Sequence, residues 1–143
     1  MKPEFSGVER RLERLKTCLL KLEPLKTKEK EEFLKDPYLR DIVERNLEVA
    51  AQVCIDIANR IISIEQLEKP QDYYEAILRL GEAEVLPRDF AQRLAPLAGF
   101  RNILVHEYLD ISWDEVYKNL QELGDLYKFM DHVKQWLRKG SLV

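Results

Sequence analysis

Arginine, histidine and tyrosine stand together in one octapeptide, Arg101-Asn102-Ile103-Leu104-Val105-His106-Glu107-Tyr108. A guanidinium holds a phosphate through paired donors and stays charged at any working pH, whereas an imidazole exchanges protons near neutrality. Cleavage of a phosphodiester needs both properties, because charge develops on the phosphate while protons move. Arg101 and His106 are therefore the candidate catalytic residues, and their chemistry needs no metal ion.

The spacing of these residues predicts which side chains can meet. On an ideal helix, His106 lies about 140° around the axis from Arg101, so one helix does not present both on one face. Asn102 and His106 share a face, which predicts that the Asn102 amide hydrogen-bonds the imidazole and fixes its tautomer. Arg101 and Tyr108 nearly align. A twofold dimer in which two such helices meet would bring two arginines and two histidines to one cleft.

Apolar residues in the first half of the chain recur in steps of three and four, the pattern of helices that bury one face. Asp36-Pro37 offers a capping side chain followed by a proline suited to the first helical position. The expected helices are Val8 to Pro24, a short one from a Thr27 cap to Lys35, and Pro37 to about Gln66.

The second half shows the same periodicity, interrupted by helix-breaking residues. Pro96 removes a backbone donor and Gly99 adds flexibility, so a kink is expected just before the octapeptide. Ser112 and Glu115 form a capping-box pattern. The expected elements are a helix from Tyr73 to about Gly81, a kinked segment from Pro87 to Tyr108, and one last helix from Trp113 to Leu137. The predicted fold class is an all-α, antiparallel four- to five-helix bundle.

Composition limits the alternatives. The chain has 143 residues, 45% of them hydrophobic and 34% charged, which suits a single helical domain over residues 1–143. Its net charge of −3 gives no general attraction to nucleic acid, so RNA contacts must be local. Cys18 and Cys54 lack metal-site spacing and are expected to be buried free thiols. No signal-peptide or membrane-spanning pattern is found, so a cytoplasmic location is expected.

The octapeptide and its surroundings resemble the HepT-like toxins, a branch of the HEPN ribonucleases with an Arg-x4-His-x-Tyr signature. Gly99-Phe100-Arg101-Asn102 running into Val105-His106-Glu107-Tyr108 carries the resemblance. It extends to the segments Asp36 to Ile64 and Pro70 to Leu80, and so covers most of the chain.

This resemblance implies a metal-independent endoribonuclease toxin with a composite site at the interface of a homodimer. An RNA 2′-hydroxyl would attack the adjacent phosphorus, with His106 moving protons and Arg101 stabilising the phosphate charge. Tyr108 matches the tyrosine to which a partner nucleotidyltransferase, the cognate antitoxin, attaches AMP as an off-switch. The implied partners are therefore RNA, that antitoxin and a second copy of the chain, with no cofactor.

A polar stripe also follows the long helix beside its apolar seam, formed by Arg45, Gln52, Asp56, Asn59 and Ser63. Such a stripe is usually a solvated face. Asp56 stands between two isoleucines, however, and we hypothesise that Asp56 or Asn59 orients Arg101 or lines the cleft.

Two further interpretations remain open from the sequence. The first is a non-catalytic helical module that binds a nucleotidyltransferase or a nucleotide, which the acidic composition suits equally well. The second is a plain helical dimerisation domain, which would leave Arg101, Asn102 and His106 without a role. Growth arrest on expression that is lost in His106→Ala would exclude both.

Overall fold

The computed structural model describes residues 5–141 and is built from helices. These are α1 (Ser6–Leu22), α2 (Lys30–Lys35), α3 (Pro37–Ile64), α4 (Tyr73–Glu82), α5 (Arg88–Leu94), α6 (Leu97–His106), α7 (Trp113–Gln121) and α8 (Gly124–Ser141), with 3₁₀ helices η2 (Glu23–Thr27) and η3 (Tyr108–Asp110). Residues 5–141 contain no strand, and the predicted all-α class is confirmed.

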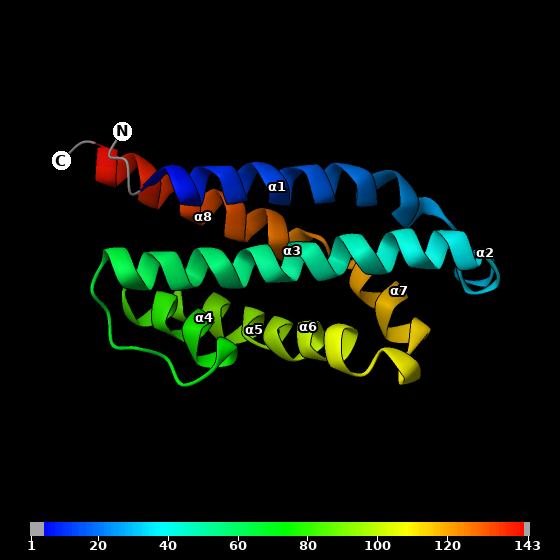
Figure 1. The fold of residues 1–143 in the computed structure, drawn as a ribbon. Coiled ribbons are helices and arrows are strands. Elements are labelled where there is room, and N and C mark those ends of the chain that lie inside the picture. Colours follow the sequence, from blue (N-terminus) through cyan, green and yellow to red (C-terminus); the bar gives the residue numbers. More distant parts are fainter. Residues whose placement is uncertain (1–4, 142–143) are drawn as a thin grey trace.

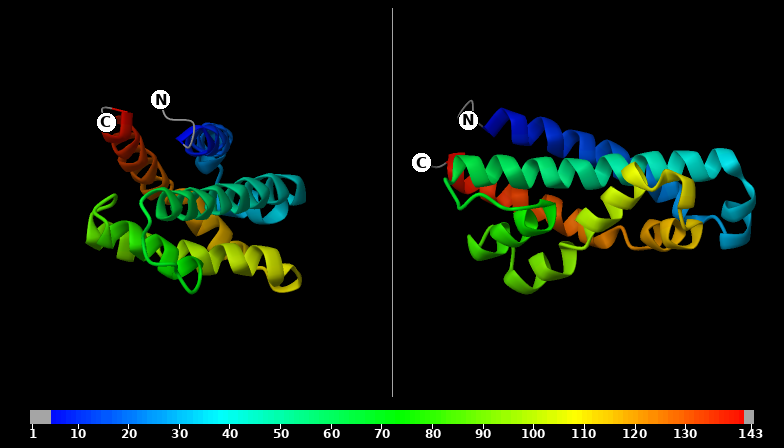
Figure 2. Two further views of the ribbon diagram at one scale, coloured as in Figure 1. Left: turned by 60° about the vertical axis from the view of Figure 1, so that its left-hand side comes forward. Right: turned by 60° about the horizontal axis from the view of Figure 1, so that its bottom comes forward.

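Helix α3 runs through the middle of the molecule. Helices α1 and α8 cover one side of it, and α4, α5 and α6 follow one another along the other side (Figures 1 and 2). The predicted apolar seam of α3 is buried almost throughout, as is that of α1. The core therefore lies around α3, and α6, which carries Arg101, Asn102 and His106, packs against it.

Local capping explains where α3 begins. The Asp36 carboxylate accepts hydrogen bonds from the backbone amides of Tyr38 and Leu39, at 3.0 and 3.2 Å, so two otherwise unpaired donors are satisfied. The predicted start at Pro37 is confirmed. The predicted Thr27 cap is wrong, because the Thr27 hydroxyl donates backwards to the carbonyl of Pro24 and α2 begins only at Lys30.

The expected kink before the octapeptide is confirmed. Helix α5 ends at Leu94, and α6 starts after Pro96 as a separate helix. Helix α5 packs chiefly on α4, whereas α6 packs on α3. The break at Pro96 thus brings the octapeptide against the central helix.

The last helix is not continuous, contrary to expectation. Helix α7 ends at Gln121, and Glu122 leaves the helical region with φ −111° and ψ 45°, so the chain turns before α8. Apolar spacing carries over the turn, since Val116, Leu120 and Leu123 are all buried, and periodicity alone therefore could not show the break.

Helix α7 is held against α2 at one end of the molecule. The Phe33 ring is fully buried between Trp113 and Tyr117, and Lys30 forms an ion pair with Asp114 at 2.7 Å. Among the helices formed by residues 5–141, none combines the length and apolar composition that a bilayer span requires.

Candidate active site

The Arg101 guanidinium is held by two hydrogen bonds in a half-buried position. Its Nε donates to Gln52 Oε1 on α3 at 2.6 Å, and its Nη1 donates to Asn102 Oδ1 at 2.9 Å. Gln52 is itself fixed, because its Nε2 donates to Asp56 Oδ1 one helical turn further on, at 2.8 Å. Nη2 makes no hydrogen bond within residues 5–141, and it is therefore free to bind an anion such as a phosphate.

An aromatic ring completes the support of Arg101. Tyr73, the first residue of α4, places its ring 5.5 Å from the Arg101 Cζ atom, within the range of a cation–π contact. The start of α4 is fixed because the Asp72 carboxylate accepts a hydrogen bond from the Glu75 amide at 2.8 Å. Three helices, α3, α4 and α6, thus converge on one guanidinium.

His106 is the last residue of α6 and is exposed. Its imidazole makes no hydrogen bond or ion pair with any other residue of the described chain, 5–141. The predicted bond between Asn102 and His106 is not formed within residues 5–141; the Asn102 amide oxygen accepts a hydrogen bond from Arg101 Nη1. Within the described residues, the imidazole therefore stands at the surface without a hydrogen-bond partner that orients it.

Tyr108 lies beyond the end of α6, in η3. Its side chain is 66% exposed, and that of Leu109 is 84% exposed. The expected alignment with Arg101 assumed a continuous helix and is wrong, since Glu107, with φ −117° and ψ 38°, turns the chain first. The phenol is consequently open to a second protein.

The two α3 candidates differ in their placement. Among the described residues, Asp56 is linked to Arg101 by hydrogen bonds through Gln52, and Asn59 forms no hydrogen bond with either Arg101 or Gln52. Gln52 is thus the α3 residue that touches the guanidinium. Gln52 belongs to the same polar stripe as Asp56, one turn earlier. The stripe therefore includes the residue that contacts Arg101, but spacing along one helix does not show which member makes that contact.

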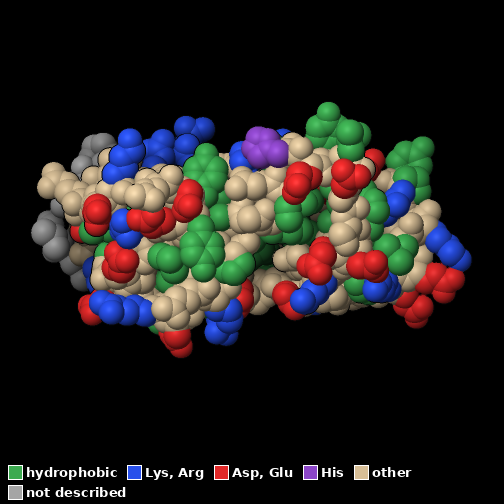
Figure 3. Space-filling model, turned by 90° about the horizontal axis from the view of Figure 1, so that it is seen from below, with side chains coloured by type: hydrophobic (Ala, Val, Ile, Leu, Met, Phe, Trp, Pro, Cys, Tyr) green, Lys and Arg blue, Asp and Glu red, His purple; other side chains and the backbone are tan. Residues whose placement is uncertain are grey.

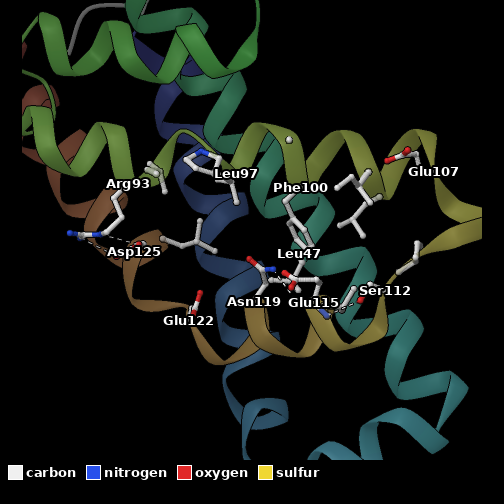
Figure 4. Close-up of a pocket in the computed structure, with 18 of the residues that line it drawn as sticks. Leu47, Arg93, Leu97, Phe100, Glu107, Ser112, Glu115, Asn119, Glu122 and Asp125 are labelled. Atoms are coloured by element: carbon white, nitrogen blue, oxygen red, sulfur yellow. Dashed lines mark hydrogen bonds and ion pairs between the residues drawn. The ribbon is translucent and has the colours of Figure 1, made fainter.

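A groove of about 640 Å³ runs along a different side of α6 from Arg101. Leu97 and Phe100 line it from α6, Leu47 from α3, and Glu115 and Asn119 from α7 (Figure 4). On the molecular surface, acidic side chains gather around an apolar hollow on this face (Figure 3). The Arg101 side chain and this groove therefore lie on different sides of the same helix.

The remaining reactive side chains lie elsewhere. Cys18 and Cys54 are buried free thiols, as predicted, and burial raises the pKa of both. His132 packs its ring 5.6 Å from that of Phe90. In the part of the chain that the structure describes, no three His, Cys, Asp or Glu side chains are arranged to hold a metal ion.

Sequence comparison relates the chain to known nucleases. The model of the family described as Ribonuclease HepT-like matches residues 8–133. The mRNA nuclease HepT of Shewanella oneidensis is 34% identical over 104 residues, which cover 72% of this chain and 78% of that protein. The tRNA nuclease HepT of Aphanizomenon flos-aquae is 34% identical over 110 residues, covering 77% and 75%.

Solved structures show the same fold. The tri-AMPylated HEPN toxin of Shewanella oneidensis, in complex with an MNT antitoxin, superposes with a TM-score of 0.82 at 28% identity, covering 94% of this chain and 99% of that one. The cytosolic protein YutE of Bacillus subtilis, of unknown function, gives a TM-score of 0.80 at 18% identity, covering 94% and 91%, and supports the fold alone.

Proposed function

Because the chain belongs to the HepT-like ribonuclease family, we propose that it is the RNA-cleaving toxin of a toxin–antitoxin pair, which acts in the cytoplasm without a metal ion. The observation that carries this proposal is the held guanidinium of Arg101, whose free Nη2 lies on the helix that ends at the exposed His106. The relatives named as mRNA and tRNA nucleases support RNA as the substrate.

In the proposed reaction, the 2′-oxygen of a ribose bonds to the adjacent phosphorus and the bond to the 5′-oxygen breaks. The attacking hydroxyl loses its proton to one imidazole, and the leaving oxygen gains one from a second. Arg101 binds the phosphate oxygens as negative charge develops there. The nucleophile is internal to the substrate, so water need not be activated.

The proposed reaction uses two imidazoles, and one chain offers only His106 for the site, because its other histidine, His132, packs against Phe90. The second imidazole must therefore come from a second chain. We place the site at the interface of a twofold homodimer. The unpartnered imidazole of His106 and the exposed Leu109, three residues further along the chain, support this assignment, because a second copy would cover an apolar side chain and complete the site.

Tyr108 is the proposed point of control. A nucleotidyltransferase antitoxin would attach AMP to its exposed hydroxyl, which adds bulk and negative charge near the site and repels RNA phosphate. The AMPylated state of the Shewanella toxin and its complex with an MNT antitoxin support this assignment.

The first test is cleavage of a labelled single-stranded RNA in excess chelator. Wild type should release 2′,3′-cyclic phosphate ends, and Arg101→Ala and His106→Ala should each lose at least about a hundredfold in rate, as when a charge-stabilising group is removed. Wild-type inactivity on varied RNAs, equal to that of both variants, would favour the non-catalytic module instead.

A mixing experiment tests the composite site. Wild type is mixed with increasing shares of His106→Ala at constant total protein and at concentrations where the subunits exchange, so that every heterodimer retains a single His106. Because the proposed reaction uses two imidazoles from two chains, the cleavage rate should fall with the square of the wild-type fraction. A rate that falls in simple proportion to the wild-type fraction would place the site within one chain.

A further inference from the structure

The groove beside α6 has an apolar floor and an acidic rim. Its floor includes Leu47, Leu97 and Phe100, and its volume of about 640 Å³ is large enough for several side chains of another protein. Glu107, Asp110, Glu115 and Glu122 line its edges, and none of them forms an ion pair within residues 5–141. Figures 3 and 4 show this arrangement.

The charge of the rim selects the occupant. Arg93 is the single base among the described lining residues, and Asp125 already neutralises it at 3.2 Å. A surface with free carboxylates repels RNA, but it attracts a helix with an apolar ridge flanked by lysines or arginines. Charge and shape therefore fit a basic amphipathic helix.

The position of the groove points to the partner that carries such a helix. Glu107, Asp110 and Ile111 line the groove, and the exposed Tyr108 lies between them in the chain. A protein seated here would stand beside the Tyr108 hydroxyl. The geometry points to this groove as the docking site for a basic amphipathic helix of the nucleotidyltransferase that modifies Tyr108, an inference that rests on the proposed function.

The rim can be reversed without touching Arg101, His106 or Tyr108. In the double variant Glu115→Lys with Glu122→Lys, two attractive contacts become repulsive. The matched control is Glu9→Lys with Glu13→Lys on α1, where both carboxylates are exposed and distant in sequence from the groove. Both double variants change the net charge equally, so only the position of the charge differs. Thermal unfolding and RNA cleavage of both verify the fold.

The first probe is a synthetic helical peptide of about 14 residues with leucine on one face and lysine on the other. Its dissociation constant, measured by fluorescence anisotropy, should rise at least about tenfold for the rim variant and stay within about twofold for the control. An analogue with glutamate in place of lysine should not bind. Equal binding by the rim variant, or by the acidic analogue, would overturn the assignment.

The second measurement is the rate of AMP addition to Tyr108 by the nucleotidyltransferase encoded with this chain. The rim variant should be modified at least about tenfold more slowly than the control, with the difference shrinking at high salt. Modification of both at the wild-type rate overturns the docking site and leaves the proposed function standing. If wild type cleaves RNA but is not modified at Tyr108, both the proposed silencing and the proposed docking partner are refuted.

A second copy of the chain is the competing occupant. Sedimentation would then show the rim variant as a smaller assembly than wild type, while AMP addition stays unchanged. That pair of results would also overturn the inference.

Discussion

Truncation of Gln52 to alanine tests whether orientation of Arg101 contributes to the proposed catalysis. Gln52 Oε1 lies 2.6 Å from Arg101 Nε, a donor that is permanently charged. A hydrogen bond to a charged group contributes about 1.5 to 3 kcal/mol, and the half-buried position of Gln52 places it at the lower end. Since about 1.4 kcal/mol corresponds to tenfold in rate, Gln52→Ala should lower kcat about tenfold.

The assay is the initial rate of RNA cleavage over a range of substrate concentrations. The loss should fall on kcat with KM nearly unchanged, because Arg101 keeps its charge and loses only its orientation for the transition state. Gln92→Ala is the matched control, the same truncation at an exposed position on α5, and it should cleave RNA at the wild-type rate.

An exchange of chemical groups sharpens this test. Gln52→Glu keeps an acceptor for Arg101 but faces the Asp56 carboxylate, to which Gln52 now donates at 2.8 Å. The repulsion should displace the side chain and lower kcat. Adding Asp56→Asn lets the amide at position 56 donate to the carboxylate at position 52, which still accepts from Arg101. This double variant should recover most of the rate. Wild-type kcat in Gln52→Ala, or no recovery in the double variant, would refute the positioning role.

Three further predictions concern stability and accessibility. Asp36→Ala removes the two bonds that cap α3 and should lower the unfolding free energy by about 1 kcal/mol, measured by urea unfolding, whereas Asp41→Ala in the interior of the same helix should not. Tyr127 donates a hydrogen bond to Glu23 at 2.9 Å, and this bond lowers the pKa of the Glu23 carboxyl. The resulting stabilisation of the folded protein is fully present above the ordinary Glu pKa of about 4.3 and is lost as pH falls through the lowered pKa. Tyr127→Phe should therefore be less stable than wild type at neutral pH, and a gap that persists in acid would contradict this linkage. Cys18 and Cys54 should react with a thiol reagent only after denaturation, because both are buried and their pKa values are raised, and rapid labelling of the native protein would show otherwise.

Most of the fold could be predicted because its determinants are local. The apolar seams of α1 and α3, the Asp36 cap and the break at Pro96 depend on residues within a turn or two of one another. The end of α7 is harder to predict, since the buried stripe continues across Glu122 and masks the turn. Gly124, the first residue of α8, is a local sign of a break, and apolar periodicity takes no account of it.

The site was harder to predict because its contacts join distant parts of the chain. Residue types drew attention to the octapeptide and helical spacing to the polar stripe, but Gln52 and Arg101, which the structure brings together, are 49 residues apart. A stripe on one helix does not show which member faces another helix. Asn102 was assigned to His106 because spacing of four favours that pair, but the nearby guanidinium of Arg101 is the charged donor and takes the amide oxygen.

The division of α6 into faces explains how one short helix can carry both the proposed catalysis and its proposed control. Arg101 faces α3, where Gln52 holds it, while Leu97 and Phe100 face the groove and His106 ends the helix at the surface. The chain leaves α5 before Pro96, and α5 packs chiefly on α4 whereas α6 packs on α3. Arginine orientation is therefore built into the monomer. Completion of the proposed site at His106 and its proposed silencing at Tyr108 both fall at the exposed end of the helix, where other chains can reach.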